Sequence, residues 1–202
     1  MRRKNSDYEK MARLAIDVYL DYDIKSFPVD AYKQAELMGF EVSHYSDYPV
    51  EVQKILIKRS EEGFNIPVPE DRMHTKKIII NDNVESEARK QSTIFHEIKH
   101  IINYDIDESP YNEDMADFFA RYMRCPTPFL IYARIEESEK IQKMFGLSKQ
   151  MARISANNVR QRVNTYGYAI FDYEVPLLKQ LLGDSYNEYI VEVIYTNEKW
   201  HT

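Results

Sequence analysis

The stretch His96-Glu97-Ile98-Lys99-His100 decides how the rest of this chain is interpreted. In a helix, side chains four residues apart lie one turn above the other on the same face, so both imidazoles can reach one metal ion. Neutral imidazoles suit Zn²⁺, and a carboxylate beside them can take a proton as water attacks a carbonyl group. The pattern predicts a zinc-dependent peptide hydrolase, with His96 and His100 as metal ligands and Glu97 as the catalytic base. The simpler interpretation is an incidental histidine pair on a surface helix, and the surrounding sequence must decide between the two.

A third metal ligand is expected, because catalytic zinc sites use three protein ligands and a water. Glu113 lies thirteen residues after His100, in the first turn of the next predicted helix, and Asp117 follows one turn later on the same face. We therefore predict Glu113 as the third ligand and Asp117 as the carboxylate that accepts a hydrogen bond from a ligand imidazole and orients it. The alternative is that both carboxylates only favour the positive N-terminal end of a helix.

Hydrophobic periodicity predicts helices separated by a few short strands. The predicted helices cover residues 5–20, 28–38, 49–59, 84–104, 112–124, 129–145, 148–166 and 175–182. A turn is predicted at Gly146-Leu147-Ser148, and Ser155 is a candidate break that would divide the helix over 148–166 into a helix-turn-helix-like pair. The predicted strands cover residues 40–45, 76–81 and 188–195, and residues 61–75 are predicted to form an irregular loop or a bent hairpin.

Together these elements predict an α+β fold that is mostly helical, with a small sheet beside the helix that carries the histidines. Residues 1–128 are expected to form the metallopeptidase core, including the N-terminal helices, and residues 129–202 a helical extension packed on it. The strand over 76–81 leads directly into the histidine helix. In zinc peptidases such a strand commonly forms the edge to which an extended substrate adds; an ordinary core strand is the alternative.

The composition is that of an ordinary globular protein, with 202 residues, 44% of them hydrophobic and 30% charged. The single cysteine, Cys125, cannot form an intrachain disulfide and fits a reducing compartment. We expect it to be a buried or helix-end residue rather than a nucleophile. No apolar run resembles a signal peptide or a membrane span, so a cytoplasmic protein without a membrane partner is predicted.

The net charge of −6 argues against direct binding of nucleic acid by the whole chain. Residues 140–171 nevertheless carry basic side chains and no acidic one: Lys140, Lys143, Lys149, Arg153, Arg160 and Arg162. This basic segment is either a solvated helical face or a docking surface for an acidic or nucleic-acid-bound partner.

Beyond the histidines, the sequence resembles the ImmA/IrrE family of metallo-endopeptidases over about residues 8–167. The matching residues run from Ile80-Asn81-Asp82 through Thr93-Ile94-Phe95-His96-Glu97 and His100 to Glu113-x-x-Ala116-Asp117-x-Phe119-Ala120 and Pro126. A fainter match continues into Phe145-Gly146-Leu147-Ser148, Arg162 and Gly167. Three features depart from the family: Lys99 replaces a glycine, Arg124-Cys125 replace apolar residues, and the interval from His100 to Glu113 is short.

This resemblance implies a zincin-like core that holds Zn²⁺, followed by a helical, helix-turn-helix-like C-terminal segment, in an intracellular bacterial protein often found in a prophage or mobile element. Family members typically sit beside a helix-turn-helix repressor and cleave it, so the expected substrate is such a repressor.

Two other functions stay open. One is a metal-stabilised module that docks a partner regulator without cleaving it, and the other is direct DNA binding, which the acidity of the chain disfavours. Candidates for stabilising the oxyanion are His74, Tyr104 and Tyr111.

Overall fold

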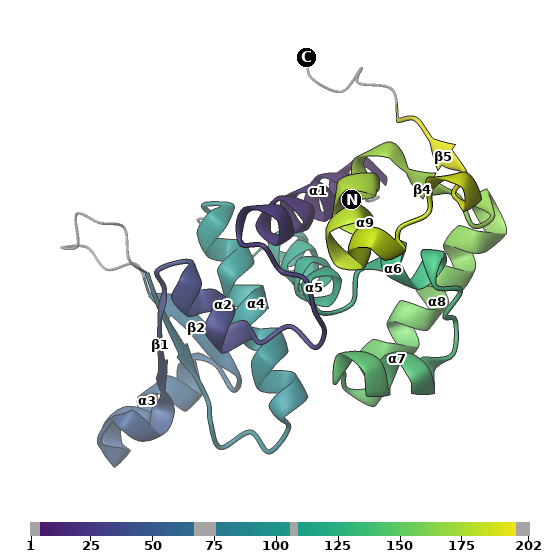
Figure 1. Cartoon of the computed structure of the whole chain (residues 1–202). Helices are drawn as coiled ribbons and strands as arrows, with labels where there is room; N and C mark the ends of the chain where they lie inside the picture. Colours follow the sequence, from purple (N-terminus) through teal and green to yellow (C-terminus); the bar gives the residue numbers. More distant parts are fainter. Residues whose placement is uncertain (1–4, 67–75, 106–108, 197–202) are drawn as a thin grey trace. The chain divides into compact units, whose positions relative to one another are not determined.

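The computed structural model describes residues 5–66, 76–105 and 109–196 of the chain (Figure 1). These residues are mostly helical and include a small mixed sheet of three strands, which confirms the predicted α+β class. They form two compact units: one comprises residues 29–120, and the other comprises the residues before Val29 and from Arg121 onward. This grouping differs from the division predicted at residue 128, because it places the first helix with the C-terminal helices.

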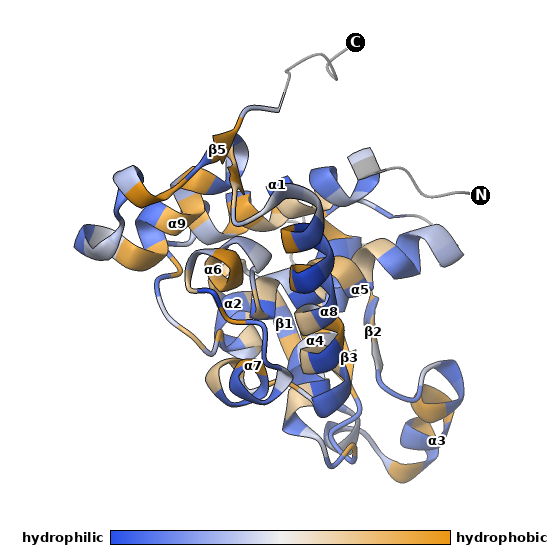
Figure 2. Ribbon diagram, turned by 90° about the vertical axis from the view of Figure 1, so that its right-hand side faces the viewer, coloured by the Kyte–Doolittle hydropathy of each residue, from blue (hydrophilic) through white to orange (hydrophobic). Residues whose placement is uncertain are grey.

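The unit over residues 29–120 contains the sheet and the histidine helix. Its elements are α2 (Ala31–Leu37), β1 (Glu41–His44), a 3₁₀ turn η1 (Tyr45–Asp47), α3 (Val50–Arg59), β2 (Gly63–Ile66), β3 (Lys77–Ile80), α4 (Glu87–Ile102) and most of α5 (Pro110–Arg124). The predicted helices over 49–59, 84–104 and 112–124 and the strands over 40–45 and 76–81 are confirmed, with ends shifted by a few residues. Helix α3 has no buried residue, and Figure 2 shows hydrophobic residues among the hydrophilic ones along it.

Strand β3 is the centre of the sheet rather than an edge. It pairs in parallel with β1 on one side and in antiparallel with β2 on the other. Its three isoleucines, Ile78, Ile79 and Ile80, are at most 1% exposed. The core-strand alternative therefore holds for residues 76–81, and an edge is offered instead by β2. That strand lies in the predicted loop or hairpin over 61–75, of which residues 67–75 lie outside the described part of the chain.

Gly63 allows β2 to lie close against both β3 and α4. A Cβ atom at this position would lie 2.8 Å from the backbone oxygen of Ile79 and 3.0 Å from Cγ2 of Thr93. Alternate residues of a strand point to the same face, so Asn65 shares with Gly63 the face toward α4. The missing side chain at position 63 thus brings the amide of Asn65 within reach of the histidine helix.

Helix α4 buries most of its second half. Its buried residues are Thr93, Ile94, Phe95, Glu97, Ile98, Lys99, His100 and Ile101. The apolar members recur at helical spacing and pack the helix onto the sheet and α2. Three ionisable side chains are buried with them, which is costly unless each has a partner of suitable charge or hydrogen-bonding capacity.

The second unit is built almost entirely of helices. Its elements are α1 (Asn5–Asp21), the end of α5, α6 (Thr127–Tyr132), α7 (Ser138–Phe145), α8 (Lys149–Tyr166), β4 (Ile170–Phe171), η2 (Asp172–Glu174), α9 (Val175–Leu182), η3 (Gly183–Ser185), η4 (Glu188–Ile190) and β5 (Val193–Ile194). Its core contains Leu130, Ile131, Ile141, Phe145, Ala152, Val159, Ile170 and Leu178. None of the helices in the described ranges has the length and apolar character needed to cross a membrane.

Three sequence-based predictions fail in this unit. The helix predicted over 129–145 is two helices, because the chain turns between α6 and α7 with Arg134 at a φ of 53°. Ser155 does not interrupt α8, since it lies buried inside a continuous helix; the turn falls earlier, at Gly146, which has a φ of 60°. The strand predicted over 188–195 is reduced to Val193–Ile194, preceded by a 3₁₀ turn.

Two other predictions can be judged from burial. Cys125 is 2% exposed, which confirms the expectation of a buried residue, and burial raises the pKa of its thiol to about 12. Five residues of the basic segment are exposed, namely Lys140, Lys143, Lys149, Arg153 and Arg160. The sixth, Arg162, instead forms a largely buried ion pair with Glu174.

Candidate metal centre

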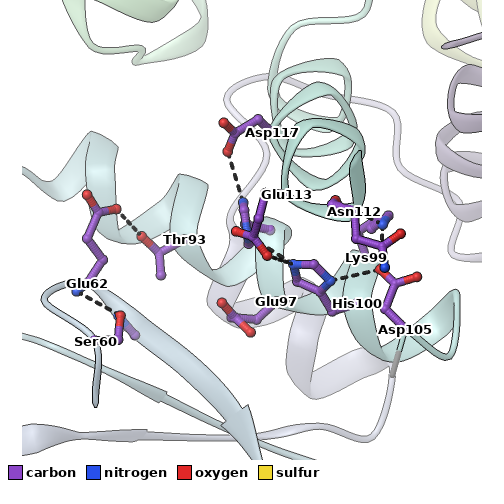
Figure 3. A network of polar contacts seen from close by, with 12 residues as sticks. Ser60, Glu62, Thr93, Glu97, Lys99, His100, Asp105, Asn112, Glu113 and Asp117 are labelled. Atoms are coloured by element: carbon purple, nitrogen blue, oxygen red, sulfur yellow. Dashed lines mark hydrogen bonds and ion pairs between the residues drawn. The ribbon is translucent and has the colours of Figure 1, made fainter. Parts of the chain in front are cut away.

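The three predicted ligands meet between α4 and α5. His96 and His100 lie one turn apart on α4. Glu113, in the first turn of α5, faces His100 (Figure 3) and also lies close to His96. The two Nε2 atoms are 3.1 Å apart, and the Glu113 carboxylate oxygens lie 3.2 Å from Nε2 of His96 and 3.3 Å from Nε2 of His100. This group could hold a metal ion.

The spacing of the donor atoms fits a tetrahedral metal site. Ligand atoms about 2.0–2.1 Å from a tetrahedral zinc lie roughly 3.3–3.4 Å from one another, close to the three separations observed. Two imidazoles and one carboxylate are also a donor set that catalytic zinc sites use. The geometry and the chemistry of the donors therefore agree.

The outer nitrogen of each imidazole contacts a carboxylate. Nδ1 of His96 lies 2.9 Å from Oδ1 of Asp117, and Nδ1 of His100 lies 2.8 Å from Oδ2 of Asp105. An ionised carboxylate can only accept, so each Nδ1 carries a proton. In the neutral rings both Nε2 lone pairs then point toward each other and toward Glu113. A cation between them would relieve this repulsion.

Asp117 has the position that the sequence predicted, with its carboxylate on a ligand imidazole. Asp105, which contacts His100 in the same way, is not predicted by the sequence, because it lies in the loop between α4 and α5 rather than at a helical spacing from the histidines. Its side chain is 5% exposed, and it also accepts hydrogen bonds from Lys99 and from Nδ2 of Asn103, the latter at 2.6 Å. Burial acts to raise the pKa of Asp105, but these donors outweigh it and hold the pKa below its usual value.

Glu97 is 7% exposed and is held by a residue of β2 that the sequence analysis also missed. Nδ2 of Asn65 donates to Oε2 of Glu97 at 2.8 Å. Burial raises the pKa of Glu97, although the hydrogen bond from Asn65 and the charges of His96 and His100 partly oppose the shift. A raised pKa suits a group that must first accept and then return a proton near neutral pH.

The residues considered for the oxyanion receive no role from this geometry. His74 lies outside the described residues. Tyr104, just after α4, is 81% exposed, and Lys76 lies over its ring. Tyr111 is 46% exposed at the start of α5.

The raised pKa of Glu97 predicts how the stability of the metal-free protein depends on pH. A carboxyl group whose pKa is higher in the folded state contributes its full stability below the unfolded value, 4.5, and loses it as the pH rises through the folded value. Replacing Glu97 with glutamine removes this loss. The melting temperature of chelator-treated Glu97→Gln protein, compared with that of the wild type, should therefore be relatively lowest below pH 4.5, rise as the pH passes through the folded pKa of Glu97, and then level off. If the difference in melting temperature between the two proteins does not change with pH, burial does not raise the pKa of Glu97.

No protein-family model matches this chain, and no curated protein matches it either. The fold and the site define a mostly helical α+β protein with a His-His-Glu group that could hold a metal ion. The resemblance to the ImmA/IrrE family remains a prediction from the residues quoted above.

Proposed function

We propose that this protein is a zinc-dependent endopeptidase whose active site lies between α4 and α5 of a zincin-like core. One observation carries the proposal: His96, His100 and Glu113 converge with both outer imidazole nitrogens held by carboxylates. Surface histidines that are only incidentally close have no need of two such oriented partners.

The residues around this group supply the rest of the hydrolytic chemistry. His96, His100 and Glu113 would hold Zn²⁺, which would supply Lewis acidity to lower the pKa of water and to polarise the scissile carbonyl. Glu97 accepts the proton that the water loses and returns it to the departing amine. Asn65 donates to one oxygen of the Glu97 carboxylate, so the other oxygen remains as the acceptor for this proton.

The position of β2 supports an extended polypeptide as the substrate. Within the described residues β2 pairs only with β3, so its other side is an edge to which a peptide can add through main-chain hydrogen bonds. Because Asn65 of β2 contacts Glu97, a peptide added at this edge would lie beside the catalytic carboxylate. The family resemblance implies a helix-turn-helix repressor as the substrate.

The proposal is tested by metal content and by cleavage of a candidate helix-turn-helix regulator co-expressed with this protein. We expect the purified chain to contain about one equivalent of zinc and to cut the co-expressed regulator at a defined bond. Treatment with a chelator should stop cleavage, and added zinc should restore it. An intact regulator in a stable complex with the zinc-loaded chain would instead support the docking module. A chain that binds no zinc would refute both.

A further inference from the structure

Several lysines and arginines form described ion pairs within residues 29–120. Of these, only Lys99 has a side chain with no exposed area. It is 0% exposed within α4, where the sequence pattern places an apolar face. Its Nζ donates to Oδ2 of Asp105 and, at 3.1 Å, to the backbone oxygen of Asn112. A buried ammonium group is costly without partners, so these two contacts explain how the charge is tolerated.

Each of the two partners is directly connected to a metal ligand. Oδ2 of Asp105, which accepts from Lys99, also accepts from Nδ1 of His100. Asn112 immediately precedes Glu113 in the first turn of α5. A single side chain therefore contacts the group that orients a ligand on α4 and the backbone that carries a ligand on α5 (Figure 3).

We propose that Lys99 is a positioning residue that sets the separation of His100 and Glu113, and so determines how tightly the centre binds its metal. The inference rests on the metal site of the proposed function, but not on peptide hydrolysis.

The positive charge of Lys99 compensates the buried negative charge of Asp105 and so stabilises this arrangement. Asp105 is 5% exposed and accepts from both His100 and Lys99 through one oxygen atom. Removing the ammonium group leaves a buried carboxylate with less compensation and removes the contact to the start of α5. Both changes act on ligand geometry, because groups that orient metal ligands from behind typically change metal affinity by 10–100-fold.

The test measures the zinc dissociation constant of Lys99→Met by competition with a chromophoric chelator. We expect binding to be roughly 10–100-fold weaker than in the wild type. Lys90→Met is the matched control, since Lys90 lies in the same helix, pairs with Glu87 and contacts no ligand partner; its zinc affinity should be unchanged. The visible spectrum of the Co²⁺-loaded protein should also change in Lys99→Met and not in Lys90→Met, because it reports ligand geometry.

Asp105→Asn provides a second variant should Lys99→Met not fold. It should weaken zinc binding to a similar degree, and the double variant should be little weaker than either single one, because both residues belong to one network. The inference is overturned if the folded variants bind zinc within twofold of the wild type. A wild-type chain that binds zinc but cuts no protein would instead refute only the proposed hydrolysis. A lysine with a purely structural role would lower the melting temperature without changing the affinity of the folded protein.

Discussion

Replacing Glu97 with glutamine is expected to slow peptide hydrolysis by roughly 10²–10⁴-fold, the usual contribution of a positioned general base. Glutamine has nearly the same shape, and its carbonyl oxygen can still accept the hydrogen bond from Asn65, so the local structure should persist. It cannot accept a proton from water. Because Glu97 is not among the three predicted ligands, the variant should retain its zinc.

The measurement is the rate of cleavage of the partner regulator, with the zinc content determined on the same sample. Glu87→Gln is the matched control: Glu87 is in the first turn of the same helix, its side chain is 61% exposed, and it pairs with Lys90. This control should cleave at the wild-type rate. Zinc-loaded Glu97→Gln protein that cleaves as fast as the wild type would show that another group takes the proton.

Replacing Arg162 with methionine is expected to destabilise the second unit by about 3–5 kcal/mol, the usual cost of breaking a buried ion pair. Glu174 is 1% exposed and accepts from Nη1 of Arg162 at 2.6 Å and from Nη2 at 2.5 Å. It also accepts from the backbone nitrogen of Phe171 at 3.0 Å. Without the guanidinium, a carboxylate would remain buried with only that amide as a described donor.

Urea unfolding at neutral pH measures this loss, and two further variants separate its causes. Arg160→Met removes an exposed arginine from the same helix, and its effect should stay within about 1 kcal/mol. The double variant Arg162→Met/Glu174→Leu removes both charges and should recover much of the stability. If Arg162→Met is as stable as Arg160→Met, the Arg162–Glu174 ion pair makes no net contribution to the free energy of unfolding.

The parts of the site that could be predicted from sequence depend on local geometry. His96 and His100 are related by one helical turn, and so are Glu113 and Asp117, so spacing alone assigns each pair to a common face. The need of a zinc site for a third protein ligand then links the histidine pair to the Glu113–Asp117 pair. The structure brings all four side chains together.

The residues that sequence reasoning missed are positioned by tertiary contacts. Asn65 reaches Glu97 only because β2 pairs with β3 and Gly63 permits a close approach to α4. The central position of β3 likewise depends on which strands pair with it. The sequence did, however, contain an indication that Lys99 is buried. It falls one turn after Phe95 on the apolar side of α4, and a charged residue on a buried face indicates a buried partner.

In the C-terminal helices, too, tertiary packing decides what local sequence preferences cannot. The tendency of Gly146 to end a helix was visible in the sequence, and the structure confirms a turn there. Serine is a poor residue for a helix interior, but the burial of Ser155 in α8 overrides that preference. Propensity is a weak guide where packing decides.

All the groups that form or orient the metal centre, apart from Asn65, lie between His96 and Asp117. Bringing ligands together over such a short contour costs little chain entropy. A metal ion bound by His96, His100 and Glu113 would therefore link α4 to α5 through contacts that are local in sequence, whereas the sheet needs strands that are farther apart along the chain.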